Sequence, residues 1–286
     1  MTATLVAVNL VGTVEQAEVG SEPYRVSRDG EPYVPVGDGG IVLGVRLGDS
    51  ALALETDHAA PGACIVHADA AAGHALTAQA CTGNPVEVRT GAAAGARGAV
   101  LGQRGEGARV IVVLAPDDLA QLRPGDSVSV RGCGQGTAPP VPGVTALNAA
   151  PGLLAALGMS VDGERVHAGV RGSWPSRVVG NGIGRPTPMW SLELSVLPPP
   201  DPDPPALALG DLVAVADLDA RFNAGYRRGW TTVGVVVHGG SPLPGHGPGL
   251  VALLTGPADR FDIAVEADGH RGLTEQILLE VARGQG

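Results

Sequence analysis

The abundance of glycine and proline is the feature that most restricts how this chain can fold. There are 44 glycines and 24 prolines among 286 residues, and helical periodicity is scant. Proline inside a helix removes a backbone hydrogen bond, and glycine weakens helices while favouring tight turns. We therefore predict a mostly β (α+β) protein with two β-barrel-like halves, in which many short strands are joined by tight turns and helices are few and short.

Apolar runs bounded by turn residues predict the individual strands, and acidic or capping residues before apolar stretches predict the helices. The predicted strands are Thr4–Val11, Ile41–Leu47, Pro85–Arg89, Gly98–Gly102, Arg109–Leu114, Ser127–Arg131, Arg165–Gly169, Trp190–Val196, Leu212–Ala216, Thr232–His238 and Gly249–Thr255. The predicted helices are Pro116–Leu122, Pro151–Leu157 and Leu273–Arg283, the last with Thr274 as its cap. The alanine-rich stretch Ala70–Ala80 fits either a helix or an extended segment.

Gly-Asp pairs at 48–49, 125–126 and 210–211 are interpreted as structural turns, because glycine tolerates a positive φ and aspartate can bond the local backbone. The proline-rich segment Thr137–Gly143 is the expected linker. It divides the chain into an N-terminal β-rich domain (1–137), with a barrel hairpin at Gly91–Gly102, and a C-terminal β-rich domain (138–286). A proline run at Pro198–Pro205 is expected to form an exposed loop of the second domain.

The charge of the chain excludes several kinds of partner and cofactor. A net charge of -10 without a basic cluster argues against nucleic acid or an anionic membrane surface. Every basic residue is arginine, so a pyridoxal phosphate Schiff base, a biotin attachment and a P-loop lysine are excluded. The glycines of Gly180–Pro186 lack the following helix and acidic residue of a dinucleotide site, so no nucleotide is expected. With these partners and cofactors excluded, we predict that the chain binds a small-molecule substrate.

Cysteine usage and hydropathy indicate a cytoplasmic protein. Three cysteines without CxxC spacing favour reduced thiols over a disulfide framework or a zinc knuckle. The first twenty residues lack a basic region and make a poor signal peptide, and no window approaches 18 continuous apolar residues. The glycine-rich loops and acidic surface allow a homo-oligomer.

The densest chemistry lies between Thr231 and Gly249, where an apolar run delivers His238, Ser241 and His246 in a glycine- and proline-lined loop. A loop of this composition suits a rigid pocket floor, so we predict the active site here. The two histidines are candidate metal ligands, and His246 is also a candidate catalytic residue. Ser241 is a candidate substrate-binding residue, and a base and nucleophile pair with a histidine is the alternative.

Other candidates follow predicted strands or turns. Asp57 and His58 are expected to act in catalysis, with His58 also a candidate metal ligand, because imidazole titrates near neutrality and a carboxylate can fix its tautomer. Cys81 is a candidate nucleophile, the alternative being a small buried residue. Three further residues are expected to bind substrate. Asn84 lies beside that thiol, and Arg185 is able to receive an anionic group. Asp219 alternates with Asp217 at a strand end, so both acids can face one pocket.

Several of these motifs in order resemble the uncharacterised domain of unknown function family 4438. They are Gly39-Gly40-Ile41, Val45–Ala51, Asp57-His58, Pro61-Gly62, Cys81–Asn84, Gly134–Gly136, Val237–Gly239, Ser241 and Gly245–Gly249. The resemblance runs over nearly the whole chain and implies a two-part, mostly β protein with a cyclophilin-like barrel element. It implies no established reaction. Gly240 departs from the pattern, because an acidic residue is expected there.

A second similarity, carried by Asp57-His58 and Gly245–Gly249, links the chain to metal-dependent amide hydrolases of the formamidase and acetamidase type. It favours an enzyme in which His58, His238 and His246 converge between the domains around a divalent metal, zinc or similar, for hydrolysis of a C–N bond. Two alternatives stay open. One is a metal-free lyase, isomerase or cyclase that uses Cys81 with a histidine, and the other is a non-catalytic binding protein whose histidines are structural.

Overall fold

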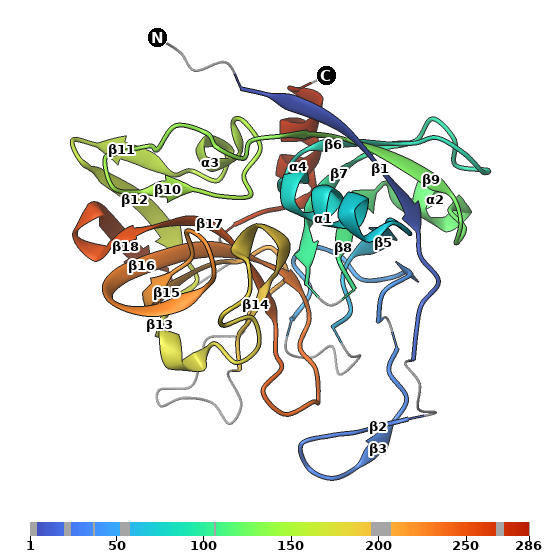
Figure 1. Cartoon of the computed structure of the whole chain (residues 1–286), viewed down its shortest axis with the longest axis horizontal. Helices are drawn as coiled ribbons and strands as arrows, with labels where there is room; N and C mark the ends of the chain where they lie inside the picture. The colour runs from blue at the N-terminus through green and yellow to red at the C-terminus, as the bar shows by residue number, and fades with distance from the viewer. Residues whose placement is uncertain are drawn as a thin grey trace.

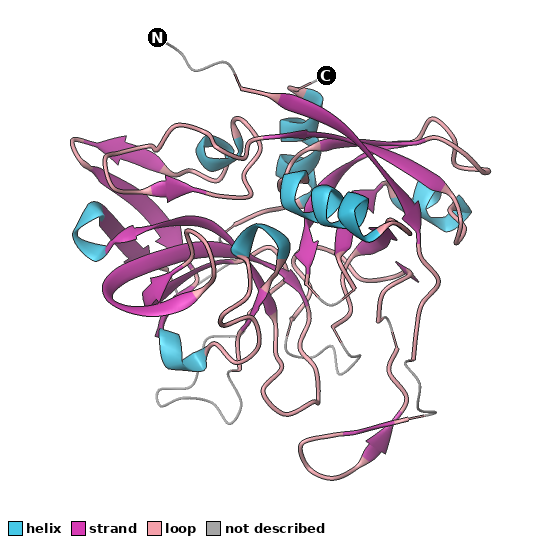
Figure 2. Ribbon diagram, in the orientation of Figure 1, coloured by secondary structure: helices cyan, strands magenta, loops and turns pink. Residues whose placement is uncertain are grey.

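Strands dominate the computed structural model, as the turn-rich sequence predicts (Figure 2). The structure describes residues 5–19, 24–36, 38–51, 58–105, 107–195, 207–266 and 272–285. Within these ranges the α-helices are short: α1 (Ala70–Gln79), α2 (Pro116–Gln121), α3 (Leu153–Ala156) and α4 (Glu275–Arg283). Short 3-10 turns are η1 (Ser176–Val178), η2 (Thr187–Met189) and η3 (Ala258–Arg260). The predicted mostly β fold class is confirmed.

The N-terminal half forms a closed, antiparallel barrel of six strands. Its strands are β1 (Ala7–Val14), β5 (Gly62–Val66), β6 (Pro85–Val88), β7 (Arg97–Arg104), β8 (Arg109–Leu114) and β9 (Ser127–Cys133). The pairing order is β1-β9-β6-β7-β8-β5, and β5 pairs back with β1 to close the ring, while β4 (Ile41–Val42) extends from β5. The predicted hairpin joins β6 to β7.

Alternate side chains of one barrel strand serve two different cores. All six residues of β8 are buried, and Val110, Val112 and Leu114 belong to the hydrophobic core that contains Leu76 of α1. The intervening Ile111 and Val113 pack in a second core shared with the C-terminal half. Because successive strand residues point to opposite faces, an uninterrupted apolar strand is what a barrel wall covered on both sides requires.

The C-terminal half is built on a second sheet with the order β10-β17-β16-β15-β13, to which β14 adds by pairing with β17. Its strands are β10 (Thr145–Ala146), β13 (Gly172–Pro175), β14 (Leu192–Glu193), β15 (Leu212–Asp219), β16 (Gly225–His238) and β17 (Gly249–Pro257). A smaller sheet has the order β11-β12-β18, and an isolated pair is formed by β2 and β3. These strands are β11 (Ser160–Asp162), β12 (Arg165–Val170), β18 (Phe261–Val265), β2 (Arg25–Val26) and β3 (Pro32–Tyr33).

The two halves lie against one another, and the last helix crosses back to the first half (Figure 1). Helix α4 contacts β6 and β7 of the barrel as well as α3. The core between the halves therefore joins barrel residues such as Leu101 to Leu253 of β17 and Leu278 of α4. No helix in the described part of the chain has the length and apolar character needed to cross a bilayer.

The Gly-Asp turns have the geometry predicted for them. Each glycine has a positive φ, and each aspartate accepts a hydrogen bond from the backbone N–H three residues before it. The φ values are 99° for Gly48, 96° for Gly125 and 92° for Gly210. The three hydrogen bonds are each 2.8 Å long and run from Arg46 to Asp49, from Arg123 to Asp126 and from Ala208 to Asp211. The proline run at Pro198–Pro205 lies outside the described residues.

Candidate functional site

Three side chains with metal-ligating atoms meet where the two halves join. His58 precedes β5 of the barrel, Glu193 belongs to β14, and His246 lies in the loop between β16 and β17. Glu193 Oε2 lies 3.2 Å from His58 Nε2 and 2.8 Å from His246 Nδ1, and the two ring nitrogens are 3.2 Å apart. The site is thus assembled from segments far apart in the sequence.

Hydrogen bonding alone does not account for these three mutual contacts. Each ring nitrogen can hold one proton, so if both histidines donate to Glu193, two N–H groups face one another. One cation can receive a lone pair from all three atoms. Ligands at about 2.0–2.2 Å from a tetrahedral ion lie about 3.3–3.6 Å from one another. The two 3.2 Å separations that involve His58 are close to this range, and the 2.8 Å separation between Glu193 and His246 is shorter. The donor set, two imidazoles and one carboxylate, is one that divalent transition metals accept.

Backbone strain and backbone hydrogen bonds fix His58. Its φ is 61°, a left-handed conformation that is uncommon for a side chain other than glycine. The His58 N–H donates to the carbonyl of Gly240 at 3.0 Å, and the Gly239 N–H donates to the carbonyl of Ala59 at 2.8 Å. The ring itself is fully buried. Strain of this kind persists only where surrounding contacts hold it, and it gathers at functional sites.

Glu193 is a buried acid in an otherwise apolar strand. It pairs in register with Gly249 of β17, and Asn181 Nδ2 donates to its Oε1 at 3.1 Å, which leaves Oε2 for the two histidines. Burial opposes ionisation, but hydrogen bonds from His246 and His58 outweigh it and hold the pKa of the Glu193 carboxyl well below its usual range. The Glu193 carboxyl is therefore ionised, as a metal ligand must be.

His246 gives the site its solvent-facing side. Its side chain is 22% exposed, whereas that of Glu193 is 3% exposed. The loop is anchored by the Asn181 N–H, which donates to the Gly245 carbonyl at 3.2 Å. Glycine is required at Gly247, because a Cβ there would lie 2.0 Å from the carbonyl oxygen of Leu194. A ligand entering from solvent would meet His246 first.

His238 lies beside the cluster, and its ring nitrogens have other partners. The ring centroid is 5.3 Å from that of His58, in an edge-on arrangement. Nδ1 donates to the Gly239 carbonyl at 2.9 Å, which leaves Nε2 to accept from the Ser191 hydroxyl at 3.3 Å. Burial lowers the pKa of His238 to about 3, so the ring is neutral. The structure gives His238 a packing position against His58, while His58 and His246 direct nitrogens at Glu193.

Cys81 and Asn84 lie apart from this cluster, in the turn that follows α1. The Cys81 side chain is fully buried, and burial raises the pKa of its thiol to about 12. Asn84 Oδ1 accepts from the backbone N–H groups of Cys81 at 2.8 Å and Cys133 at 3.1 Å, and its Nδ2 donates to the Cys133 carbonyl at 2.8 Å. These contacts let Asn84 link two backbone segments. Burial keeps the Cys81 thiol protonated at neutral pH.

Arg185 and Ser241 have different surroundings. The Arg185 guanidinium carbon lies 4.6 Å from the ring centroid of Trp190, a cation–π contact. Ser241 is buried and adjoins Gly240, whose carbonyl receives the His58 N–H. Its hydroxyl accepts from the Leu243 N–H at 3.1 Å and stabilises the loop that carries His246. Ser241 therefore lies close in sequence to residues that position the site, but its hydroxyl forms a hydrogen bond within the loop.

The predicted acids divide between two regions. Asp219 lies at the far end of the β15–β16 hairpin, where it pairs with Arg221 at 2.8 Å and Arg227 at 3.1 Å. Its neighbour Asp217 accepts from the Gly229 N–H at 2.7 Å. Both acids thus form contacts within the β15–β16 hairpin and do not take part in the His58–Glu193–His246 cluster. Asp57 lies outside the described residues.

Comparisons with known proteins place the chain in a family. The models for the N-terminal and C-terminal parts of a domain of unknown function, DUF4438, match residues 24–155 and 156–270. A solved structure described as "Crystal structure of TM1086" is similar to the chain with a TM-score of 0.88 and 32% identity, covering 93% of this chain and 95% of that one. The chain belongs to the DUF4438 family.

The DUF4438 resemblance drawn from the sequence motifs is confirmed. The family models meet at residues 155 and 156, while the linker was predicted at Thr137–Gly143 and the domain boundary between residues 137 and 138. Their descriptions name no cyclophilin-like element, and that detail stays a prediction. None of the curated proteins compared matches the chain.

Glu193 is the member of the candidate site that sequence reasoning missed. An acidic residue was expected at position 240, whereas the carboxylate comes from a different strand. No local signal pointed to it, because Glu193 alternates with Leu192 and Leu194, a pattern typical of a strand whose acid faces solvent, whereas the structure buries all three side chains. A carboxylate in a strand buried on both faces needs a partner, and that requirement points to a site.

A second buried charge near His238 was also missed. Arg104 at the end of β7 is 2% exposed and pairs with Asp38 at 2.5 Å between Nη2 and Oδ1. Burial opposes ionisation of Asp38, but Arg104 and two further arginines outweigh it and lower the pKa of the carboxyl. The positive charge of Arg104 also contributes, after burial, to the low pKa of His238. Such a pair places fixed charge on the barrel side of the site.

Proposed function

We propose that this chain is a metal-dependent enzyme that hydrolyses a C–N bond of amide type in a small polar molecule. The convergence of His58 Nε2, Glu193 Oε2 and His246 Nδ1 on one point carries the proposal. Two histidines and one glutamate form a donor set used by zinc peptidases, which cleave C–N bonds. The metal, zinc or a similar divalent ion, would be the only cofactor.

The chemistry divides between the ion and the side chains of this chain. A bound divalent ion would polarise a carbonyl oxygen and lower the pKa of water. Glu193 would supply negative charge, held in place by Asn181, so that the buried cation is compensated. The exposed edge of His246 would admit the substrate. In the net reaction water adds its oxygen to the carbonyl carbon, the C–N bond breaks, and the leaving nitrogen takes a proton.

The burial of Cys81 favours this proposal over a reaction at its thiol. A thiolate is the reactive form of cysteine, and burial keeps Cys81 protonated at neutral pH. The three cysteines are free, which supports a reducing, cytoplasmic setting as part of the proposal. We further propose that the chain works without nucleic acid or membrane partners and forms homo-oligomers.

Elemental analysis of the purified, untagged protein tests the metal. We expect about one divalent ion per chain, and its loss in His58→Ala, His246→Ala and Glu193→Gln. His74→Ala is the matched control, because His74 is exposed on α1 and belongs to no such cluster among the described residues. Circular dichroism and thermal melting must show that each variant is folded. A metal-free wild type after refolding with excess zinc, cobalt or manganese would refute the proposal.

The reaction is tested by release of ammonia or amine from linear and cyclic amides. Activity should vanish on chelation, return with the metal, and persist in Cys81→Ser. A folded Cys81→Ser variant that binds metal but is inactive would instead support chemistry at the thiol. A protein that binds metal but cleaves none of these amides would support a metal-binding role without hydrolysis.

A further inference from the structure

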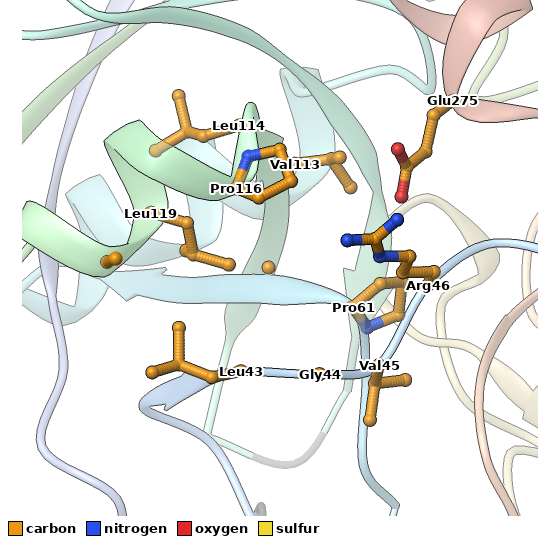
Figure 3. Close-up of a pocket in the computed structure, with 12 residues that line it drawn as sticks. Leu43, Gly44, Val45, Arg46, Pro61, Val113, Leu114, Pro116, Leu119 and Glu275 are labelled. Atoms are coloured by element: carbon orange, nitrogen blue, oxygen red, sulfur yellow. The ribbon is translucent and has the colours of Figure 1, made fainter.

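A small pocket on the barrel side of the molecule has the features of a second ligand site (Figure 3). It has a volume of about 230 Å³ and lies between the segment after β4, the start of β5, helix α2 and the first residue of α4. Most of its lining is aliphatic, with side chains such as Leu43, Val45, Pro61, Leu114 and Leu119. No lining residue belongs to the His58–Glu193–His246 cluster.

Two opposite charges stand at one end of this pocket. The head groups of Arg46 and Glu275 point toward one another in Figure 3, and both residues line the cavity. The Arg46 backbone is fixed, because its N–H donates to Asp49 Oδ2 at 2.8 Å. Among the described residues, neither the Arg46 guanidinium nor the Glu275 carboxylate has an ion-pair partner within 4.0 Å. An apolar pocket with a cation and an anion at one end matches a ligand that carries both charges at one end of an apolar body.

The volume limits the size of that ligand. Binding sites for drug-sized molecules usually measure about 300–1,000 Å³. A cavity of about 230 Å³ is therefore below that range. At about 30 Å³ for each water in the liquid, it holds roughly eight water-sized groups. An aliphatic amino acid about the size of leucine fits a space of this size.

We propose that this pocket binds a free aliphatic α-amino acid of the leucine type. Its side chain would pack against Leu43, Pro61 and Leu119, its α-carboxylate would receive the guanidinium of Arg46, and its α-ammonium would donate to Glu275. Arginine suits the carboxylate because its planar fork can make two parallel hydrogen bonds. Requiring both charges distinguishes a free amino acid from a residue within a peptide. The site is independent of the proposed hydrolysis.

Isothermal titration of the full chain with L-leucine tests the proposal, with three probes that each remove one feature. They are 4-methylpentanoate, which lacks the amine, 3-methylbutylamine, which lacks the carboxylate, and L-serine, which lacks the aliphatic body. We expect saturable binding of L-leucine at one site per chain, and binding at least about tenfold weaker for each probe. Two probes each lose a hydrogen bond to a charged group, and L-serine loses the apolar contact of the side chain.

Variants then assign each charge. Arg46→Gln should weaken leucine and 4-methylpentanoate but leave 3-methylbutylamine unchanged, and Glu275→Gln should do the reverse. Ala120→Trp should block every ligand, since Ala120 lines the pocket from the exposed face of α2. Arg97→Gln is the matched control, because its side chain is 82% exposed on another part of the barrel. Absence of leucine binding at millimolar concentration would overturn the proposal, as would leucine binding that none of the three pocket variants changes.

Discussion

At the scale of single residues, burial separates side chains that can react from those that only pack. The sequence made His58, His238 and Cys81 all candidate site residues, since each stands at a strand end or turn. The structure separates them. His238 is neutral and both of its ring nitrogens form hydrogen bonds, and Cys81 is a protonated thiol. His58 and His246 instead direct nitrogens at an ionised carboxylate. The same residue type thus has different chemistry according to its neighbours.

The two buried thiols should make stability depend on alkaline pH. Burial raises the pKa of Cys64 and of Cys81 from 9.0 to about 12. The unfolded chain therefore loses these protons above pH 9 while the folded chain keeps them, so stability is full below pH 9 and falls as pH rises toward 12. Between pH 8.5 and 10.5 we expect each thiol to lower the free energy of unfolding by about 2 kcal/mol.

Urea unfolding at the two pH values measures this fall. Cys64→Ala and Cys81→Ala should each reduce the drop by about the amount of one thiol, whatever the substitution itself costs at pH 8.5. Cys133→Ala is the control, because this residue is only partly buried. An equal drop in wild type and in both buried-thiol variants would show that other groups govern the alkaline loss.

At the scale of elements, the register between β16 and β17 decides the position of the histidines. His238 at the end of β16 stands opposite Gly249 at the start of β17. The ring lies directly over that glycine, where an added Cβ would be 1.8 Å from His238 Nε2. Glycine at this one position therefore lets the ring fill the space beside His58, and the loop between the strands carries His246. A shift of either strand would separate the two sides of the site.

We expect Gly249→Ala to displace His238 and weaken the site. Overpacking of a buried position typically costs about 1–3 kcal/mol, so the melting temperature and the metal content should both fall. Gly240→Ala is a matched control in the same loop, because its Cβ would meet nothing nearer than 3.5 Å. Melting curves and elemental analysis of the two variants provide the comparison. If Gly249→Ala kept wild-type stability and metal content, the ring would have room to move and this account of the register would be wrong.

At the scale of the whole molecule, local sequence patterns predicted most strands and helices but not how the strands close into a barrel. Every predicted strand overlaps an observed one, and Thr274 caps α4 by accepting from the Ile277 N–H at 3.2 Å. Strand β5 was missed, because Gly62–Val66 begins with small residues and lacks alternation. It is this strand that closes the barrel by pairing with β1. Glu193 was missed for a related reason, since its partners are 135 and 53 residues away along the chain. Pairing over such distances leaves no local signal.

The shared core implies that the two halves unfold together. Leu278 of α4 is fully buried in the core that also holds Leu101 of the barrel and Leu253 of the second sheet. Truncating a buried leucine to alanine costs about 2–5 kcal/mol. We therefore expect Leu278→Ala to lower the melting temperature of the whole molecule in one transition, although α4 is the last element of the chain.

Two probes followed during the same melt distinguish one transition from two. Tryptophan fluorescence reports on the C-terminal half, because the three tryptophans, Trp174, Trp190 and Trp230, all lie there. Alkylation of Cys64 by a thiol reagent reports on the barrel, since this residue is buried on β5. Leu278→Ala should move both signals to the same lower temperature, while Glu280→Ala on the exposed face of α4 should leave both nearly unchanged. A variant in which only the fluorescence transition shifts would mean that the barrel is stable without α4. The core between the halves would then be a contact between independent domains, and the candidate metal site would lie at a surface able to open.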